Sequence, residues 1–207
     1  MVEQPVALTR RERRKREVRG RILEAAHELF EERGVAETRV ADISERADVA
    51  QKTFFNYFPS RQHLMRALAE TALDDLLAYV EEARKLPAPT PKQLAHLFGI
   101  FAENAEAAGP MHRELLSEII HVAYQSFNEP EHALRLNQAF GALVREGVER
   151  GDVTDAHDVD TLTQTVLGTF YSLMFSWSKF EGYPLAERAR AAARFLGEAL
   201  APRRTNP

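Results

Sequence analysis

The spacing of apolar residues predicts an amphipathic helix ahead of Gly34. Apolar side chains recur there at intervals of three and four residues, which places them on one face of a helix. The stripe consists of Ile22, Ala25, Ala26, Leu29 and Phe30. Gly34 stands where a left-handed residue would end the helix, so we expect the helix to stop near Arg33.

Two shorter helices are expected to follow. Thr38 is a suitable N-cap for the second helix, in which Ile43 and Ala47 lie one turn apart and face the core. The next residues make a break that is long enough only for a tight turn. The third helix is then expected over Gln51–Tyr57.

The rest of the chain also has a helical pattern. Pro59 cannot continue the third helix, and Ser60 is a suitable N-cap for a long fourth helix that joins the two halves of the chain. The fourth helix carries Leu64, Leu68, Ala72 and Leu76 on one face. After a proline-rich break, helical patterns resume over residues 92–107, 111–127, 131–150, 156–180 and 185–200. Alternating strand patterns are missing, so we predict an all-α fold of about nine helices.

The composition restricts the possible chemistry. The 207 residues include no cysteine, which excludes disulfides, thiolate metal sites and cysteine nucleophiles. The N-terminus is basic and polar with no apolar run behind it, and the most apolar segment, 166–180, is too short to span a bilayer. We therefore expect a soluble cytoplasmic protein that does not bind a membrane.

Charge is distributed unevenly along the chain. Residues 1–66 carry a formal net charge of +3, whereas the remainder carries −7. Basic side chains gather near the N-terminus: Arg10, Arg11, Arg13, Arg14, Lys15, Arg16, Arg19 and Arg21. Such a run suits a polyanion, and binding through it weakens as salt is added. A solvated charged tail is the alternative, and residues 1–17 are expected to form a basic flexible arm.

Two short helices joined by a tight turn and braced by a preceding helix are the layout of a helix-turn-helix. Its second helix, Gln51–Tyr57, would enter the major groove of DNA. Phe54 and Phe58 are four residues apart and would pin this helix to the core, which leaves the other side chains facing outward. An aromatic core stripe is the alternative for these phenylalanines. That alternative gives no role to Lys52 and Asn56, which can reach base edges and phosphates.

This segment resembles the DNA-binding domain of the TetR family over residues 18–68. The matching stretches are ILEAAHELF at 22–30, Gly34, and VADISERADVAQKTFFNYFPSR at 40–61. The resemblance implies a three-helix DNA-binding domain over residues 18–66. It also implies a ligand-responsive regulator, and favours a repressor, that binds a double-stranded operator as a homodimer.

The resemblance also implies which side chains contact DNA. These are Arg39, Gln51, Lys52, Thr53, Phe55, Asn56, Tyr57 and Arg61. From the basic run we add Arg14 and Arg16 as contacts to DNA.

Three positions depart from the usual pattern of this family. Asp48 replaces a glycine in the turn, and Asp tolerates left-handed geometry better than most residues. Ala50 replaces a serine cap and forfeits a hydrogen bond worth about 1 kcal/mol. Phe55 replaces a tyrosine, so Tyr57 is expected to supply the hydroxyl for a phosphate.

Residues 67–207 form the expected ligand-binding and dimerisation domain. Its aromatic and Met-rich positions suit an apolar or aromatic effector. The candidate ligand-binding residues are Phe98, Phe101, Met111, Leu115, Ile119, Phe127, Phe140, Phe170, Tyr171, Met174 and Trp177. Because aromatic residues at helical spacing are more often core, only part of this set is expected to contact a ligand.

The last two helices are expected to form the dimer interface. Small residues recur every four positions on the first of them, and the second has an alanine-rich stripe. The predicted interface residues are Gly168, Ser172, Ser176, Ala189, Ala192 and Leu196. Dimerisation would place two recognition helices about 34–36 Å apart, which suits a pseudo-palindromic operator.

Two other functions remain open at this stage. Glu118 with His121, and Glu129 with His132, have the Glu-x-x-His spacing of di-iron carboxylate bundles, although Pro130 places the second pair at a helix start. The other alternative is a DNA-binding module whose C-terminal domain only dimerises or binds a protein. For the regulator we expect no catalytic residue, no metal and no cofactor.

Overall fold

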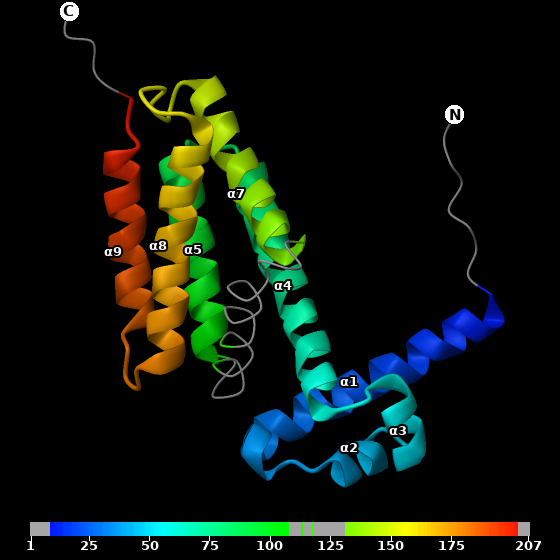
Figure 1. Ribbon diagram of the computed structural model, residues 1–207. Helices are drawn as coiled ribbons and strands as arrows, with labels where there is room; N and C mark the ends of the chain where they lie inside the picture. Colours follow the sequence, from blue (N-terminus) through cyan, green and yellow to red (C-terminus); the bar gives the residue numbers. More distant parts are fainter. Residues whose placement is uncertain (1–8, 108–112, 114–116, 118–130, 203–207) are drawn as a thin grey trace, which may run out of the picture. The chain divides into compact units, whose positions relative to one another are not determined.

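The computed structural model describes residues 9–107, 113, 117 and 131–202. These residues form helices and no strand, which confirms the predicted all-α class (Figure 1). The helices are α1 (Arg10–Glu37), α2 (Val40–Arg46), α3 (Gln51–Tyr57), α4 (Arg61–Lys85), α5 (Thr90–Ala107), α7 (Glu131–Arg150), α8 (Val159–Lys179) and α9 (Leu185–Ala199). The chain divides into two compact units, Met1–Leu68 and Ala69–Pro207.

Helix α1 begins at Arg10, inside the segment that was expected to be a flexible arm. A capping box starts it: the Thr9 hydroxyl accepts the N–H of Glu12 at 3.3 Å, and the Glu12 carboxylate accepts the N–H of Thr9 at 2.8 Å. These two bonds satisfy donors that the first turn of a helix leaves free. The Thr-x-x-Glu signature is visible in the sequence, so the longer helix could have been predicted from it.

Gly34 interrupts α1 as expected, with φ 84° and ψ 162°, and a final turn follows to Glu37. The expectation that Thr38 caps α2 is wrong. Its side chain is buried and its hydroxyl donates backward, to the carbonyls of Gly34 at 2.8 Å and Leu29 at 3.2 Å. Thr38 therefore satisfies the carbonyl end of α1, where acceptors lack helical partners. Helix α2 is capped instead at Arg39.

The helix-turn-helix has the predicted bounds and core. Helix α3 spans Gln51–Tyr57, and both Phe54 and Phe58 are buried, with ring centroids 5.9 Å apart. The turn before it contains Asp48 at φ 52°, the left-handed geometry expected there. The N-cap residue Ala50 makes no side-chain hydrogen bond, so the start of α3 depends on its packing.

An ion-pair cluster on the surface joins α2 to α1. The Arg46 guanidinium donates to Glu28 at 2.9 Å and to both carboxylate oxygens of Glu32, at 3.0 and 3.1 Å. The hydrogen bond from Arg46 lowers the pKa of Glu32 below its ordinary value. Because all three side chains are substantially exposed, this cluster fixes geometry more than it adds stability.

The second unit has one hydrophobic core formed by α4, α5, α7, α8 and α9, with α5 packed along α9 and α7 along α8. The ring of Phe170 on α8 lies at its centre. Its centroid is 4.7 Å from that of Phe101, 5.4 Å from that of Phe140 and 5.7 Å from that of Phe98. Aromatic pairs at these separations attract one another beyond their burial of area.

A buried polar network joins the start of α5 to the end of α7. The Arg150 guanidinium donates to Thr90 at 2.9 Å and to Gln93 at 3.1 Å, and the Thr90 hydroxyl donates to Asp152 at 2.6 Å. Thr90 and Gln93 are almost fully buried, so these bonds are costly to break. Gly147 lies against this network, since a Cβ there would come within 2.3 Å of the Thr90 hydroxyl.

Candidate nucleic-acid interface

Helix α3 turns its polar side chains outward. Phe54 and Phe58 point into the core, which leaves the opposite faces for the predicted contacts to DNA. Gln51, Lys52, Phe55 and Asn56 are exposed, while Thr53 and Tyr57 are half-buried. Phe55 is 46 % exposed and meets the ring of Phe54 edge-on at 5.4 Å. An aromatic ring held outward in this way can pack on a thymine methyl or a sugar.

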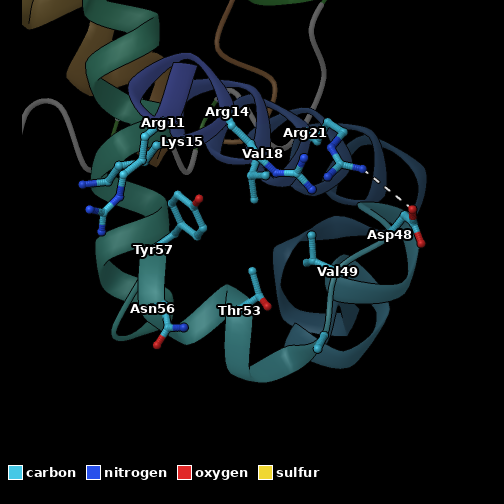
Figure 2. A pocket seen from close by; sticks show the side chains of 11 residues that line it. Arg11, Arg14, Lys15, Val18, Arg21, Asp48, Val49, Thr53, Asn56 and Tyr57 are labelled. Carbon is cyan, nitrogen blue, oxygen red and sulfur yellow. Dashed lines mark ion pairs between the residues drawn. The ribbon is translucent and has the colours of Figure 1, made fainter. Parts of the chain in front are cut away.

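A basic groove of about 650 Å³ lies between α1 and the helix-turn-helix. Figure 2 shows side chains of α1 along one wall and side chains of α3 and its preceding turn along the other. The lining residues are Arg11, Arg14, Lys15, Val18, Arg21, Asp48, Val49, Ala50, Thr53, Asn56 and Tyr57. The groove therefore joins three predicted DNA contacts of α3 to the basic run.

The structure separates the two arginines that were chosen from the basic run. Arg14 lines the groove, whereas Arg16 lies on another face of α1 and is exposed to solvent. Arg11, Lys15 and Arg21 also line the groove, although the sequence analysis did not single them out. Counted with Arg14, their spacings of three, four and seven residues would have identified one helical face, had the helix been extended to the capping box.

Arg61 has a structural task that the sequence did not indicate. Its guanidinium donates to the carbonyl of Thr38 at 2.8 Å and to that of Val35, and it lies 5.7 Å from the centroid of the Phe30 ring. A cation at this point is favoured because the carbonyls at the end of a helix carry partial negative charge. Arg61 thus holds the end of α1 against the start of α4. The predicted contact at Arg39 is exposed at the start of α2.

The predicted ligand-binding residues fall into two groups. Phe98, Phe101, Phe140, Phe170, Met174 and Trp177 are buried in the core of the second unit, and Tyr171 is half-buried. Met111, Leu115, Ile119 and Phe127 lie outside the described residues. The aromatic cluster around Phe170 is thus part of the hydrophobic core of the second unit.

Two of the predicted interface residues are wrong. Ala189 and Leu196 are fully buried in the core of their own subunit, because this stripe of α9 packs against α5. Gly168 and Ser172 are exposed and Ser176 and Ala192 are half-buried, so these four remain accessible to a partner. The outward apolar residues that the sequence analysis missed are Phe175 on α8, 46 % exposed, and Phe195 on α9, 64 % exposed.

A di-iron enzyme would require clustered metal ligands, and a membrane protein would require a long apolar helix. The side chains of both Glu-x-x-His pairs, Glu118 with His121 and Glu129 with His132, lie outside the part described. Within the described side chains, no three His, Asp or Glu residues gather in a way that could hold a metal ion. None of the helices in those ranges is long and apolar enough to cross a membrane.

Comparison with known proteins identifies the same DNA-binding segment. Residues 22–68 match the model of the family described as "Bacterial regulatory proteins, tetR family". The "Fatty acid metabolism regulator protein" of Bacillus subtilis is 26 % identical over 75 % of this chain and 81 % of its own length. The crystal structure of Thermus thermophilus FadR, a TetR-family repressor in complex with lauroyl-CoA, is 25 % identical with a TM-score of 0.65, covering 91 % of this chain and 98 % of that one.

The fold extends over both units. A TetR-family regulator from Pectobacterium atrosepticum superposes with a TM-score of 0.75 at 19 % identity, covering 97 % of this chain and all of that chain. These proteins share the DNA-binding segment or the helical fold with this chain, and they are described as regulators. Residues 22–68 therefore form a DNA-binding domain of the TetR family, and the chain as a whole is similar to bacterial transcription regulators of that family.

Proposed function

We propose that the protein is a repressor that binds a pseudo-palindromic operator as a homodimer and releases it when a small hydrophobic ligand binds. It would act in the bacterial cytoplasm, on the nucleoid. The observation that carries the proposal is the outward face of α3, where Gln51, Lys52 and Asn56 are exposed while Phe54 and Phe58 anchor the helix. An anchored helix with free polar side chains is what readout in the major groove requires.

The first experiment is selection of DNA by the intact protein. Fragmented bacterial genomic DNA is incubated with it at physiological salt, and the retained fragments are sequenced. A repressor of this kind should enrich a few fragments that share a pseudo-palindrome. Uniform retention that vanishes with added salt would contradict sequence-specific binding.

The second experiment assigns readout to α3. Lys52→Ala combined with Asn56→Ala should reduce operator affinity at least 10-fold, because each lost base contact is worth about 1–3 kcal/mol. Lys92→Ala with Asn104→Ala changes the same residue types at exposed positions of α5 in the second unit and should leave the affinity unchanged. Equal affinities for the two double variants would remove α3 as the recognition helix.

The homodimer is proposed to form through the outer faces of α8 and α9. Phe175 and Phe195 are exposed there, and Gly168 and Ser172 leave room for another helix to approach. Phe175→Glu with Phe195→Glu should convert the dimer to a monomer in sedimentation experiments. Leu134→Glu replaces a similarly exposed apolar residue on α7 and should leave the dimer intact. If the variant with both Phe175→Glu and Phe195→Glu remains a dimer, the interface lies elsewhere.

An acyl thioester is the ligand class to test first. The Thermus regulator is described with lauroyl-CoA, and the second unit of this chain has an apolar, aromatic core around Phe170. Lauroyl-CoA should release the operator and raise the stability of the protein, by about 2.7 kcal/mol at 100 times its dissociation constant. Coenzyme A without the acyl chain is the control. If no acyl-CoA acts and no other hydrophobic compound stabilises the protein, the second unit only dimerises or binds a protein.

A further inference from the structure

The cationic wall of the groove between α1 and α3 is built from residues that precede the segment matched to the family. Arg11, Arg14, Lys15 and Arg21 supply this wall, whereas the match to the family begins at residue 22. These side chains share one face of α1 because they recur every three or four residues, apart from one gap occupied by Val18. The capping box at Thr9 and Glu12 keeps this part of the chain helical and so maintains the wall.

Charge is not spread evenly along the groove. Figure 2 shows Arg11 and Lys15 on the side that holds Asn56 and Tyr57, and Asp48 on the opposite side. There the carboxylate of Asp48 is fully exposed and lies 3.8 Å from the guanidinium of Arg21. Asp48 is the one acid among the residues that line the groove. The groove thus has one cationic end and one end where charge is balanced.

The acids of this part of α1 do not neutralise the cationic end. The Glu12 carboxylate accepts the backbone N–H of Thr9, and this hydrogen bond lowers the pKa of Glu12. Glu17 lies four residues after Arg13 and seven after Arg10, so its carboxylate is beside these two arginines on the helix. Neither Glu12 nor Glu17 lines the groove.

We propose that the cationic end of the groove binds phosphates of the DNA backbone, and that Asp48 keeps the backbone away from the other end. The proposal rests on the proposed function, since it concerns the strand beside the bases that α3 would read. Arg11 and Lys15 supply charge, while the Tyr57 hydroxyl supplies a hydrogen-bond donor to the same phosphates. A carboxylate and a phosphate repel each other, so Asp48 limits the positions that the strand can take and fixes the register of α3.

The test compares two double variants on the same helix that remove the same charge. Arg11→Ala with Lys15→Ala changes the groove face, and Arg10→Ala with Arg13→Ala changes the solvent face. Alanine preserves the helix in both. Operator affinity is measured between 50 and 200 mM KCl for the intact protein, with the operator obtained from the genomic selection. Each phosphate contact contributes a slope of about −0.9 to the logarithmic salt dependence of affinity.

The groove variant should lose about two contacts. Its salt slope should be shallower than that of the wild type by about 1.8, so that it loses roughly 12-fold less affinity over this salt range than the wild type does. The salt slope of the solvent-face variant should differ from that of the wild type by less than about 0.9, the value for one phosphate contact. Equal slopes for the two double variants would overturn the proposal.

Asp48→Asn tests the end of the groove that is proposed to repel the DNA backbone. This substitution should raise DNA affinity. Asparagine also tolerates the left-handed geometry at φ 52°, so the turn should be preserved. Affinity for the operator and for unrelated duplex should rise several-fold at 50 mM KCl and less at 200 mM. Glu45→Gln removes a similarly exposed acid of α2 that does not line the groove and is the control. An Asp48→Asn affinity no higher than that of the control would refute the role of Asp48.

Failure of this proposal can be told apart from failure of the proposed function. If the wild type enriches no sequence, or if Lys52→Ala with Asn56→Ala leaves operator affinity intact, the recognition role of α3 is wrong. If the wild type binds a specific operator through α3 but the groove and solvent-face variants have equal salt slopes, only the phosphate site is wrong.

Discussion

Gly34 provides a direct test of how the helix-turn-helix is connected to α1. Its backbone has φ 84° and ψ 162°, a region that residues with a side chain avoid. A Cβ built at Gly34 would meet no atom within 4 Å, so Gly34→Ala introduces backbone strain without a clash. Gly20 is the matched control: it lies in the regular part of the same helix, and its Cβ would also meet open space.

The two substitutions should have opposite signs. Strain of this kind costs about 1–3 kcal/mol, so Gly34→Ala should destabilise the first unit by that amount. Gly20→Ala should stabilise the same unit by about 0.5–1 kcal/mol, because alanine restricts the unfolded chain and favours the helix. The destabilisation should lie toward the upper limit, since the Gly34 carbonyl also accepts the Thr38 hydroxyl and would move with the strained backbone.

Hydrogen exchange of the intact protein is the suitable assay. The single tryptophan, Trp177, lies in the second unit, so its fluorescence does not report on the first. Amides of α2 and α3 should exchange about 5- to 150-fold faster in Gly34→Ala and more slowly in Gly20→Ala, at about tenfold for each 1.4 kcal/mol. Amides of α8 should not change. Protection in Gly34→Ala equal to that of the wild type would refute the argument from backbone geometry.

Three further changes test other contacts. Thr38→Val removes a buried hydroxyl that donates to two carbonyls and should destabilise the first unit by about 1–3 kcal/mol, measured by the same exchange of α2 and α3 amides. Gly147→Ala forces a Cβ against the buried Thr90 hydroxyl and should lower the free energy of unfolding by about 1–3 kcal/mol, measured by urea unfolding with tryptophan fluorescence. An unchanged free energy of unfolding would show that the polar network around Thr90 rearranges without cost. The pKa of Glu12 is lowered by the N–H of Thr9, so its contribution to the helix is complete above its ordinary value of 4.5 and disappears as pH falls through the lowered value. Circular dichroism should show α1 losing helix in that range, and Glu12→Gln should flatten the change.

The helix-turn-helix could be predicted from the sequence because its signals are local. The bounds of α3, the burial of Phe54 and Phe58 and the left-handed turn at Asp48 follow from helical periodicity and from the geometry each residue tolerates. The outward residues of α3 followed from the same reasoning, since two buried positions determine the whole face of a short helix. The sequence also contains the signal for the start of α1, the capping box of Thr9 and Glu12, although the basic run favoured the prediction of a flexible arm.

What the tertiary structure decided depends on groups that are distant in sequence. Arg61 donates to a carbonyl 23 residues away, so its task at the end of α1 leaves no periodic signal. Ala189 and Leu196 lie on a smooth apolar stripe, and only the packing of α5 shows that the stripe faces the subunit's own core and not a partner. Periodicity reveals that a helix has an apolar face but not what covers it, because packing partners are selected by shape and burial across the whole chain. The groove between α1 and α3 has the same origin: the sequence determined the charges, and the fold determined which of them line one groove with Asn56 and Tyr57.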